Sequence, residues 1–261
     1  MAGRRSPVPA ASWHLAIEAG GRTGAENMAI DLALLRAAQE GQASLRLYRW
    51  SPPCLSFGRN EPACSRYNLE EIRALGLDTV RRPTGGRAVW HDRELTYALA
   101  APTAMFGSLQ EAYITIHQML AEALRGLGAP VEVARRPSGR APGPGSGACF
   151  AAPVGGEIVA GGLKLVGSAQ VREGDALLQH GSLLLENGQD VVTRVTVGPS
   201  VPPAATALSA VLGRPVTFDE VADAIAETAK LSWEGTWTTV VPPCSADDVA
   251  RFADPDWTLR R

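Results

Sequence analysis

The chain has 261 residues, enough for one large domain or two modest ones, and its 45% apolar and 20% charged residues are ordinary for a globular protein. Its 25 basic and 27 acidic residues give a formal net charge of −2, which argues against a general nucleic-acid binder because phosphates demand a basic excess. No apolar run approaches the roughly 18 residues of a membrane-spanning helix, and no signal-peptide segment is recognisable. We therefore expect no nucleic-acid or membrane partner and a cytoplasmic location.

Hydrophobic periodicity, caps and turn formers predict the elements in chain order. Residues 1–11 are expected to form a flexible tail before a single domain at 12–261, whose short helical C-terminal extension begins near residue 216. Helices are predicted at 27–40, 68–76, 108–127 and 217–231. Strands are predicted at 45–50, 54–58, 79–82, 88–90, 94–100, 130–133, 157–160, 163–170 and 176–185. Runs of strands between groups of helices favour an α+β fold, with a mixed β-sheet flanked by helices.

Two details of this pattern bear on how the chain is organised. Pro52 and Pro53 break the strand at 45–50, so the strand at 54–58 is expected to be its hairpin partner. Residues 135–147 are dense in Arg, Pro, Gly and Ser, which predicts a mobile loop rather than a regular element.

The usage of lysine and cysteine narrows the set of candidate catalytic residues. Of the 25 basic residues only Lys164 and Lys230 are lysine, so a lysine retained among so many arginines indicates a need for a compact ammonium group. The four cysteines form no C-x-x-C pair, and the four histidines are scattered. We expect neither a metal site nor a disulfide framework, which leaves the hypothesis that one cysteine is a nucleophile.

A pair of glycines follows the predicted strand at 79–82. Gly85 and Gly86 let backbone N–H groups approach a ligand closely and bind an anion or a carbonyl oxygen, and Arg82 is placed to pair with a phosphate or carboxylate. A plain hairpin turn also explains the two glycines. His91, at the end of the same segment, is by itself more typical of a structural histidine than of a catalyst.

Three further segments contain candidate functional residues. Lys164 lies between glycines, where its ammonium group can stabilise negative charge on a substrate oxygen, unless it is simply a solvated strand residue. Cys149 lies in a turn of small residues that is accessible to substrate, and nearby cations or N–H groups would activate its thiol. His180 lies where a strand meets a turn, and its role stays open between catalysis and structure.

Taken in chain order, these segments resemble one family. Arg81–Asp92 (RRPTGGRAVWHD), Lys164–Gln170 (KLVGSAQ) and Leu178–Ser182 (LQHGS) are similar to the motifs of the lipoate-protein ligase/octanoyltransferase family, which is biotin/lipoate protein ligase-like. Asn27–Asp31 (NMAID) resembles the N-terminal helix motif of that family, and the resemblance covers residues 13–190. It implies an α+β catalytic domain whose mixed sheet forms a tunnel for an acyl chain.

Within the family, the chain is most similar to the octanoyl-[acyl carrier protein]:protein N-octanoyltransferases. Cys149 and Phe150 occupy the place of their nucleophile segment, and the Asn-Asp dipeptide typical of ATP-dependent ligases is missing. The resemblance implies that Cys149 and Lys164 are catalytic. It implies that the substrate is bound by Arg82, Gly85, Gly86, His91, Gly167, Ser168, Ala169, His180 and Gly181.

The implied reaction is transfer of an octanoyl group from octanoyl-acyl carrier protein to a lysine of a lipoyl domain, through a thioester on Cys149. It requires no cofactor and no metal. The implied acceptor is a lipoyl-domain protein, such as glycine cleavage H protein or the E2 subunit of a 2-oxoacid dehydrogenase. His180 would either deprotonate the acceptor amine or orient its own strand.

Three alternatives stay open on the sequence. An ATP-dependent lipoate-protein ligase would use Lys164, Arg82 and the glycine pair to hold an acyl-adenylate. An amidotransferase would move octanoyl or lipoyl groups between carrier proteins through the same cysteine. A non-enzymatic acyl-binding module is disfavoured, because Cys149 and Lys164 occur together.

Overall fold

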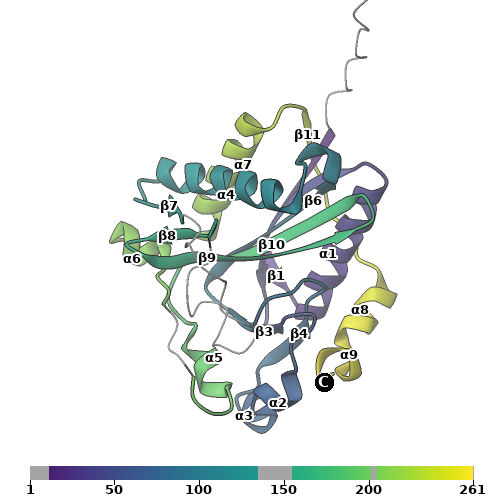
Figure 1. Ribbon diagram of the computed structural model, residues 1–261, viewed down its shortest axis with the longest axis vertical. Helices are drawn as coiled ribbons and strands as arrows, with labels where there is room; N and C mark the ends of the chain where they lie inside the picture. The colour runs from purple at the N-terminus through teal and green to yellow at the C-terminus, as the bar shows by residue number, and fades with distance from the viewer. Residues whose placement is uncertain (1–11, 135–154, 201–203, 261) are drawn as a thin grey trace, which may run out of the picture.

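Two β-sheets form the centre of the fold (Figure 1). The computed structural model describes residues 12–134, 155–200 and 204–260, so the expected tail at 1–11 and the expected loop at 135–147 lie outside the described residues. The strands of the larger sheet are β1 (Ser12–Arg22), β2 (Ala43–Trp50), β6 (Glu94–Pro102), β7 (Glu132–Val133), β8 (Ile158–Ala160), β9 (Leu163–Glu173), β10 (Ala176–Leu184) and β11 (Thr236–Thr239). Their spatial order is β11-β1-β2-β6-β10-β9-β8-β7. β1 pairs in parallel with β2 and β11 and the other pairs are antiparallel, which confirms the predicted mixed sheet.

Helices cover both faces of the larger sheet (Figure 1). α4 (Leu109–Gly126) and α7 (Phe218–Ser232) pack on one face, in a buried cluster with inward side chains of β6 and β10. α1 (Gly24–Gln39) packs on the other face, and α8 (Ala246–Ala253) packs against α1. The predicted α+β fold is therefore confirmed. Within the described segments, no helix is both long enough and apolar enough to cross a membrane.

The smaller sheet consists of β3 (Cys54–Phe57), β4 (Asp78–Arg81) and β5 (Val89–His91), in the order β4-β3-β5. The short helices α2 (Ala63–Arg66), α3 (Leu69–Ala74) and α5 (Asp190–Val195) pack around it and share its buried cluster. The prediction that 54–58 pairs with 45–50 is wrong, because β3 pairs with β4 and β5 instead. Pro52 and Pro53 have no backbone N–H to offer β2, and the chain leaves the larger sheet there.

Local sequence signals explain where the helices begin. Thr23 and Ser108 each form a capping box at the start of α1 and α4, so α1 begins before the predicted residue 27 and α4 begins where predicted. The Asn68 side chain accepts from the N–H groups of Glu70 and Glu71 at the start of α3, also as predicted.

The C-terminal region contains more structure than the helix predicted at 217–231. β11 extends the larger sheet at its β1 edge, and α9 (Pro255–Thr258) follows α8. Arg36 of α1 donates to both carboxylate oxygens of Asp248 in α8, at 2.5 and 3.1 Å. The short elements η1 (Thr103–Met105) and α6 (Leu208–Leu212) complete the described structure.

Candidate active site

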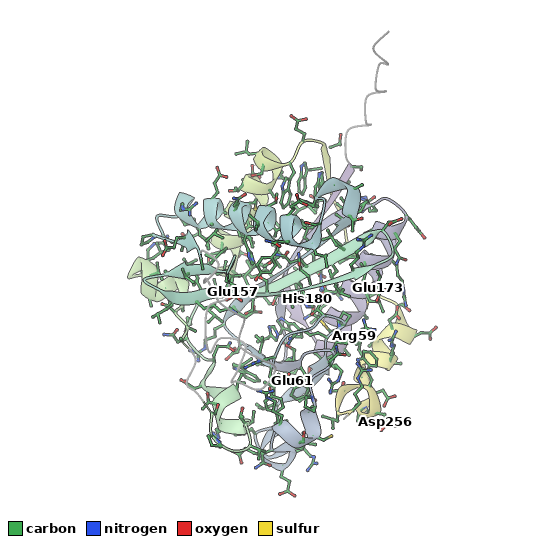
Figure 2. All side chains as sticks on the ribbon, in the orientation of Figure 1. Arg59, Glu61, Glu157, Glu173, His180 and Asp256 are labelled. Carbon is green, nitrogen blue, oxygen red and sulfur yellow. The ribbon has the colours of Figure 1, made fainter. Side chains whose placement is uncertain are left out.

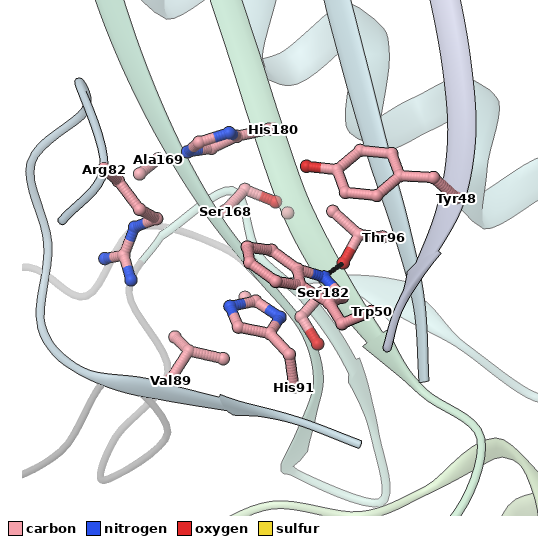
Figure 3. A pocket seen from close by; sticks show the side chains of 12 residues that line it. Tyr48, Trp50, Arg82, Val89, His91, Thr96, Ser168, Ala169, His180 and Ser182 are labelled. Carbon is pink, nitrogen blue, oxygen red and sulfur yellow. Dashed lines mark hydrogen bonds between the residues drawn. The ribbon is translucent and has the colours of Figure 1, made fainter. Parts of the chain in front are cut away.

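A pocket lies between the two sheets, on the face of the larger sheet that α1 partly covers (Figure 3). The empty space within it is about 330 Å³, counting the part that is open to solvent. Its lining residues are Tyr48, Trp50, Arg82, Val89, His91, Thr96, Gly167, Ser168, Ala169, His180, Gly181 and Ser182. The structure thus brings together every implied substrate-binding residue except Gly85 and Gly86, which lie in the loop just after Arg82.

Small residues on β9 and β10 leave room for this pocket. Gly167 lies opposite Ser182 in the β9–β10 ladder, and Ala169 lies opposite His180 one step further along. Because successive side chains of a strand point to opposite faces, these four residues share the pocket face.

Arg82 fixes the shape of the glycine loop. Its buried guanidinium donates to the Ser56 carbonyl and hydroxyl at 2.8 and 2.5 Å, and to the carbonyls of Gly85 and Arg87 at 3.2 and 2.9 Å. Gly86 has a φ of 93°, which favours glycine, and a Cβ added there would lie 3.8 Å from Ala169 Cβ. The glycine loop therefore lies directly over β9, and Arg82 is engaged in holding it.

His180 is hydrogen-bonded through both ring nitrogens. Nδ1 lies 2.8 Å from Asp31 Oδ2, and Nε2 lies 2.6 Å from Thr84 Oγ1. Because an ionised carboxylate only accepts, Nδ1 carries a proton, and in the neutral ring the Thr84 hydroxyl donates to Nε2. Asp31 also accepts from the Tyr48 hydroxyl at 2.9 Å and from Arg46 at 3.1 Å. All five side chains are buried, and this geometry favours an orienting role for His180 over proton abstraction.

A β-bulge turns Lys164 toward the pocket face. Ile158 of β8 lies opposite Val166 of β9, but the next residue, Val159, lies opposite Lys164, so Leu165 is the extra residue. Leu165 and Val166 both join the cluster under α4. Lys164 shares a face with Val159, which is opposite to that of Ile158, and so lies on the pocket side of the sheet. Strict alternation along β9 would have placed it on the α4 side.

A carboxylate balances the charge of Lys164. Nζ donates to Glu157 Oε1 at 2.5 Å, and both side chains are buried. The Lys164 backbone is held as well, because its N–H donates to the Ala204 carbonyl at 3.0 Å and its carbonyl accepts from Thr206 at 2.9 Å. A buried, compensated ammonium excludes the simpler interpretation of Lys164 as a solvated strand residue.

Lys164 and His180 lie at different places along the sheet. His180 is opposite Ala169, five positions after Lys164 in β9; because Leu165 is an extra residue, this corresponds to four ladder steps, or about 13 Å at the rise of a strand. Figure 2 labels His180 and Glu157, the partner of Lys164, at different places in the molecule. Lys164 Nζ is bonded to Glu157 and both ring nitrogens of His180 are bonded to Asp31 and Thr84, so the two side chains act at different places in the site.

His91 forms part of the pocket wall. Its ring stacks on Trp50, with centroids 4.0 Å apart, and its Nε2 lies 2.6 Å from the Ser56 hydroxyl. Burial lowers the pKa of His91 and so favours the neutral ring, while the nearby Glu94 carboxylate opposes this shift. The Ser56 hydroxyl is shared between His91 Nε2 and the guanidinium of Arg82. This geometry makes His91 a structural wall residue rather than a base.

The Ser168 side chain, and the space that a side chain at Gly181 would occupy, lie on the opposite face of the sheet. The Ser168 hydroxyl lies 2.7 Å from the Tyr97 hydroxyl and 2.8 Å from His117 Nε2, both on the α4 side. A Cβ on Gly181 would collide with Ser168 Oγ and come within 2.8 Å of Tyr97 Cε1. Glycine at 181 is thus required by packing, and a substrate contact by the Ser168 hydroxyl stays a prediction.

The cysteine assigned as nucleophile, Cys149, lies outside the described residues. Of the cysteines within them, Cys54 is buried, and burial raises the pKa of its thiol, which makes it a poor nucleophile. Cys64 and Cys244 are exposed and do not line the pocket. In the described part of the chain, no group of three or more His, Cys, Asp or Glu side chains is arranged to hold a metal ion.

Sequence reasoning missed three partners of the predicted residues: Glu157, Asp31 and Thr84. Asp31 is 149 positions from His180, and Thr84 is 96 positions from it, so only the fold brings them together. Glu157 is the exception, because a carboxylate seven positions before a buried lysine, across a turn between two strands, is a recognisable signal.

Known proteins resemble this chain in sequence. The model of the lipoyl protein ligase A/B catalytic domain matches residues 23–230. The octanoyltransferase LipM of Kyrpidia tusciae is 39% identical over 274 aligned residues, covering 96% of this chain and 99% of that protein. The octanoyltransferase LipM of Moorella thermoacetica is 44% identical over 190 residues, covering 70% of this chain and 69% of that protein.

Solved structures resemble it in fold. A T. acidophilum protein described as a lipoate protein ligase, with bound lipoic acid, superposes with a TM-score of 0.75 at 20% identity, covering 95% of this chain and 99% of that one. A lipoate-protein ligase A bound with ATP superposes with a TM-score of 0.71 at 22% identity, covering 95% and 94%. At such identities the likeness concerns the fold alone.

Proposed function

The chain belongs to the family of the lipoyl protein ligase A/B catalytic domain, and from this premise we propose that it is an octanoyltransferase of lipoate biosynthesis. The observation that carries the proposal is the similarity to the Kyrpidia tusciae octanoyltransferase over 96% of the chain. The pocket supports it, because aromatic and small side chains suit a saturated acyl chain, and each buried methylene contributes about 0.8 kcal/mol.

Cys149 is the nucleophile of this proposal. Its thiolate attacks the carbonyl carbon of octanoyl-acyl carrier protein, and the tetrahedral oxyanion collapses with departure of the carrier's thiolate, which takes up a proton. The amine of the acceptor lysine then attacks the Cys149 thioester. An amide forms, the amine loses a proton, and the Cys149 thiolate is regenerated. Because the donor thioester is already activated, neither step consumes a nucleotide.

Lys164 stabilises the oxyanion in both steps. The bulge at Leu165 supports this role because it turns the side chain to the pocket face, and Glu157 supports it by keeping the amine charged. A well-placed donor of this kind lowers the barrier by roughly 3–4 kcal/mol. Gly86 lies over Ala169, near the His180 end of the pocket, so we assign Gly85 and Gly86 to binding of the substrate and not to the oxyanion.

The acceptors are lipoyl-domain proteins. A glycine cleavage H protein or a 2-oxoacid dehydrogenase E2 subunit is the specific acceptor that we propose, and octanoyl-acyl carrier protein is the specific donor. A cytoplasmic location agrees with both partners and stays a prediction.

The test follows the acyl group by intact-mass spectrometry. Wild-type protein mixed with octanoyl-acyl carrier protein should gain the mass of one octanoyl group, labile to hydroxylamine, and should pass it to a lipoyl domain without ATP. Cys149→Ala should form no thioester. Lys164→Arg should keep its fold and lose on the order of 100-fold in transfer rate, because a planar guanidinium cannot replace a compact ammonium beside Glu157.

The ligase alternative is an outcome of the same experiment. Octanoate with ATP and magnesium should give little product if the chain is a transferase. Robust ATP-dependent modification with release of pyrophosphate, unaffected by Cys149→Ala, would overturn the proposal in favour of an acyl-adenylate mechanism.

A further inference from the structure

We infer that His180, braced by Asp31 and Thr84, sets the length of the acyl chain that the pocket admits. The inference rests on the proposed octanoyl transfer and adds a specificity-determining residue to it. Its basis is the position of a fully hydrogen-bonded polar cluster at one end of the pocket, with Gly167 and Ser182 toward the other end. Lys164 does not line the pocket and lies further along β9 in that second direction.

The order of residues along the strands defines the two ends of the pocket. Moving along β9 from Lys164, Gly167 comes first and Ala169 second, and their partners on β10 are Ser182 and His180. Figure 3 shows the same order, with His180 and Ala169 at one end of the pocket and Ser182 toward the other. A chain whose carbonyl group is held near Lys164 therefore points its methyl end at His180.

The pocket closes immediately beyond His180. The next pocket-face residue of β10 is Leu178, which is fully buried in the cluster formed with α1. Ala100 of β6 and Met28 of α1 belong to the same cluster. A longer chain therefore has no space to enter unless the side chain of His180 moves.

The surrounding contacts prevent that movement. Turning the His180 ring would break its hydrogen bonds to Asp31 and to Thr84, and both of these side chains are buried. Asp31 is held in turn by Tyr48 and by Arg46, whose guanidinium stacks on the Tyr48 ring at 3.8 Å and bonds Asn27 at 2.7 Å.

A pocket end formed by hydrogen-bonded polar groups discriminates between acyl-chain lengths more sharply than an apolar end does. An apolar wall repacks around an extra methylene, and such pockets separate homologous ligands by about 10–200-fold. Here an extra methylene must leave buried polar atoms unpaired, which costs more than a packing adjustment. The expected result is a steep fall in activity between octanoyl and decanoyl donors.

Two measurements on the full chain test the inference. The first is kcat/KM for hexanoyl-, octanoyl-, decanoyl- and dodecanoyl-acyl carrier protein, and the second is the calorimetric affinity for the corresponding free fatty acids. Wild-type protein should prefer octanoyl to decanoyl by about 100-fold or more. His180→Ala should lower that ratio at least tenfold while binding of the longer acids improves.

A second variant covers the case in which His180→Ala does not fold. Ala169→Leu fills the same end of the pocket from β9 and should move the preference from octanoyl to hexanoyl. Ser182→Ala, one step closer to Lys164, is the matched control and should leave the octanoyl-to-decanoyl ratio unchanged. An unchanged ratio in folded His180→Ala, or an Ala169→Leu variant that still prefers octanoyl, would overturn the inference.

The two readouts separate this inference from the proposed function. If fatty acids bind with a sharp limit at eight carbons but no octanoyl group is transferred, the proposed function fails and the length limit stands. If octanoyl groups are transferred but all chain lengths are accepted equally, the length limit fails and the proposed function stands.

Discussion

The ion pair between Lys164 and Glu157 is the residue-scale feature that most directly tests the proposed catalytic role of Lys164. Both groups are buried, so the carboxylate offsets the cost of keeping an ammonium group out of water. In Glu157→Gln the neighbour is neutral, and burial then favours the uncharged amine. The alkaline limb of the kcat/KM profile should therefore move to lower pH in this variant.

Steady-state rates of octanoyl transfer across the pH range measure this effect. Glu157→Asp, which keeps the charge on a shorter side chain, is the control and should restore most of the wild-type profile. If Glu157→Gln lowers the rate by the same factor at every pH, Glu157 is a purely structural residue.

His117 gives a second residue-scale prediction, concerning stability. Burial, with a smaller contribution from the charge of Lys164, lowers the pKa of His117 from 6.5 to about 4, while its hydrogen bond to the Gly156 carbonyl opposes the shift. The unfolded chain therefore binds a proton at higher pH than the folded one does. The contribution of His117 to the free energy of unfolding is therefore fully present above pH 6.5. It is lost as the pH falls toward 4, and the total loss is about 3 kcal/mol.

Urea unfolding at several pH values between 6.5 and 4 measures this loss. His117→Gln has no group that titrates in this range, so its unfolding free energy should fall less steeply with acid than that of wild-type protein. Parallel curves for the two proteins would show that other groups cause the acid sensitivity.

At the scale of elements, the pairing of β9 with β10 depends on a glycine. A methyl group at position 181 would push against Ser168, the Gly167 carbonyl and Tyr97. Gly181→Ala should lower the free energy of unfolding by about 1–3 kcal/mol, the usual cost of overpacking. Gly126→Ala, at the end of α4 with open space around its Cα, should be neutral or slightly stabilising. Equal stability of the two variants would contradict this account of Gly181.

The elements that were predicted correctly are those with strong local signals. Ser108 marks the start of α4 because its capping box is contained within four residues, and β8, β9 and β10 form a meander joined by short glycine turns. β1 was missed because its side chains do not alternate regularly between buried and exposed. Its place is fixed instead by pairing with β2 and with β11, more than 200 positions away.

The geometry of the candidate site, like that of β1, could be predicted only in part from local sequence signals. The motifs located the pocket, since Arg82, Ala169 and His180 all line it. The bulge at Leu165 was not foreseen, because alternation along β9 alone places Lys164 on the wrong face. Pairing with the separate strand β8 sets that register, and a single-strand pattern contains no information about it.

At the scale of the whole molecule, the C-terminal segment ties the two sheets together. Buried Arg81 of β4 donates to the carbonyls of Trp257, Thr258 and Arg260, and on its other side to those of Gly58 and Glu61. The same segment packs α8 on α1, which covers the larger sheet. The residue after Arg81 is Arg82, so the glycine loop over the pocket starts from a strand that the C-terminal segment holds.

Phe252 tests how much stability this arrangement contributes. It is the most deeply buried large side chain of α8, 1% exposed, and belongs to the cluster with Met28 and Leu35 of α1. Phe252→Ala should lower the free energy of unfolding by about 3–5 kcal/mol, because it removes a packed aromatic ring and leaves a cavity. Leu231→Ala on α7, where the side chain is 87% exposed, is the matched control and should change stability by less than about 0.5 kcal/mol. Urea unfolding followed by circular dichroism measures both; similar values for the two variants would mean that α8 is not part of the cooperative core.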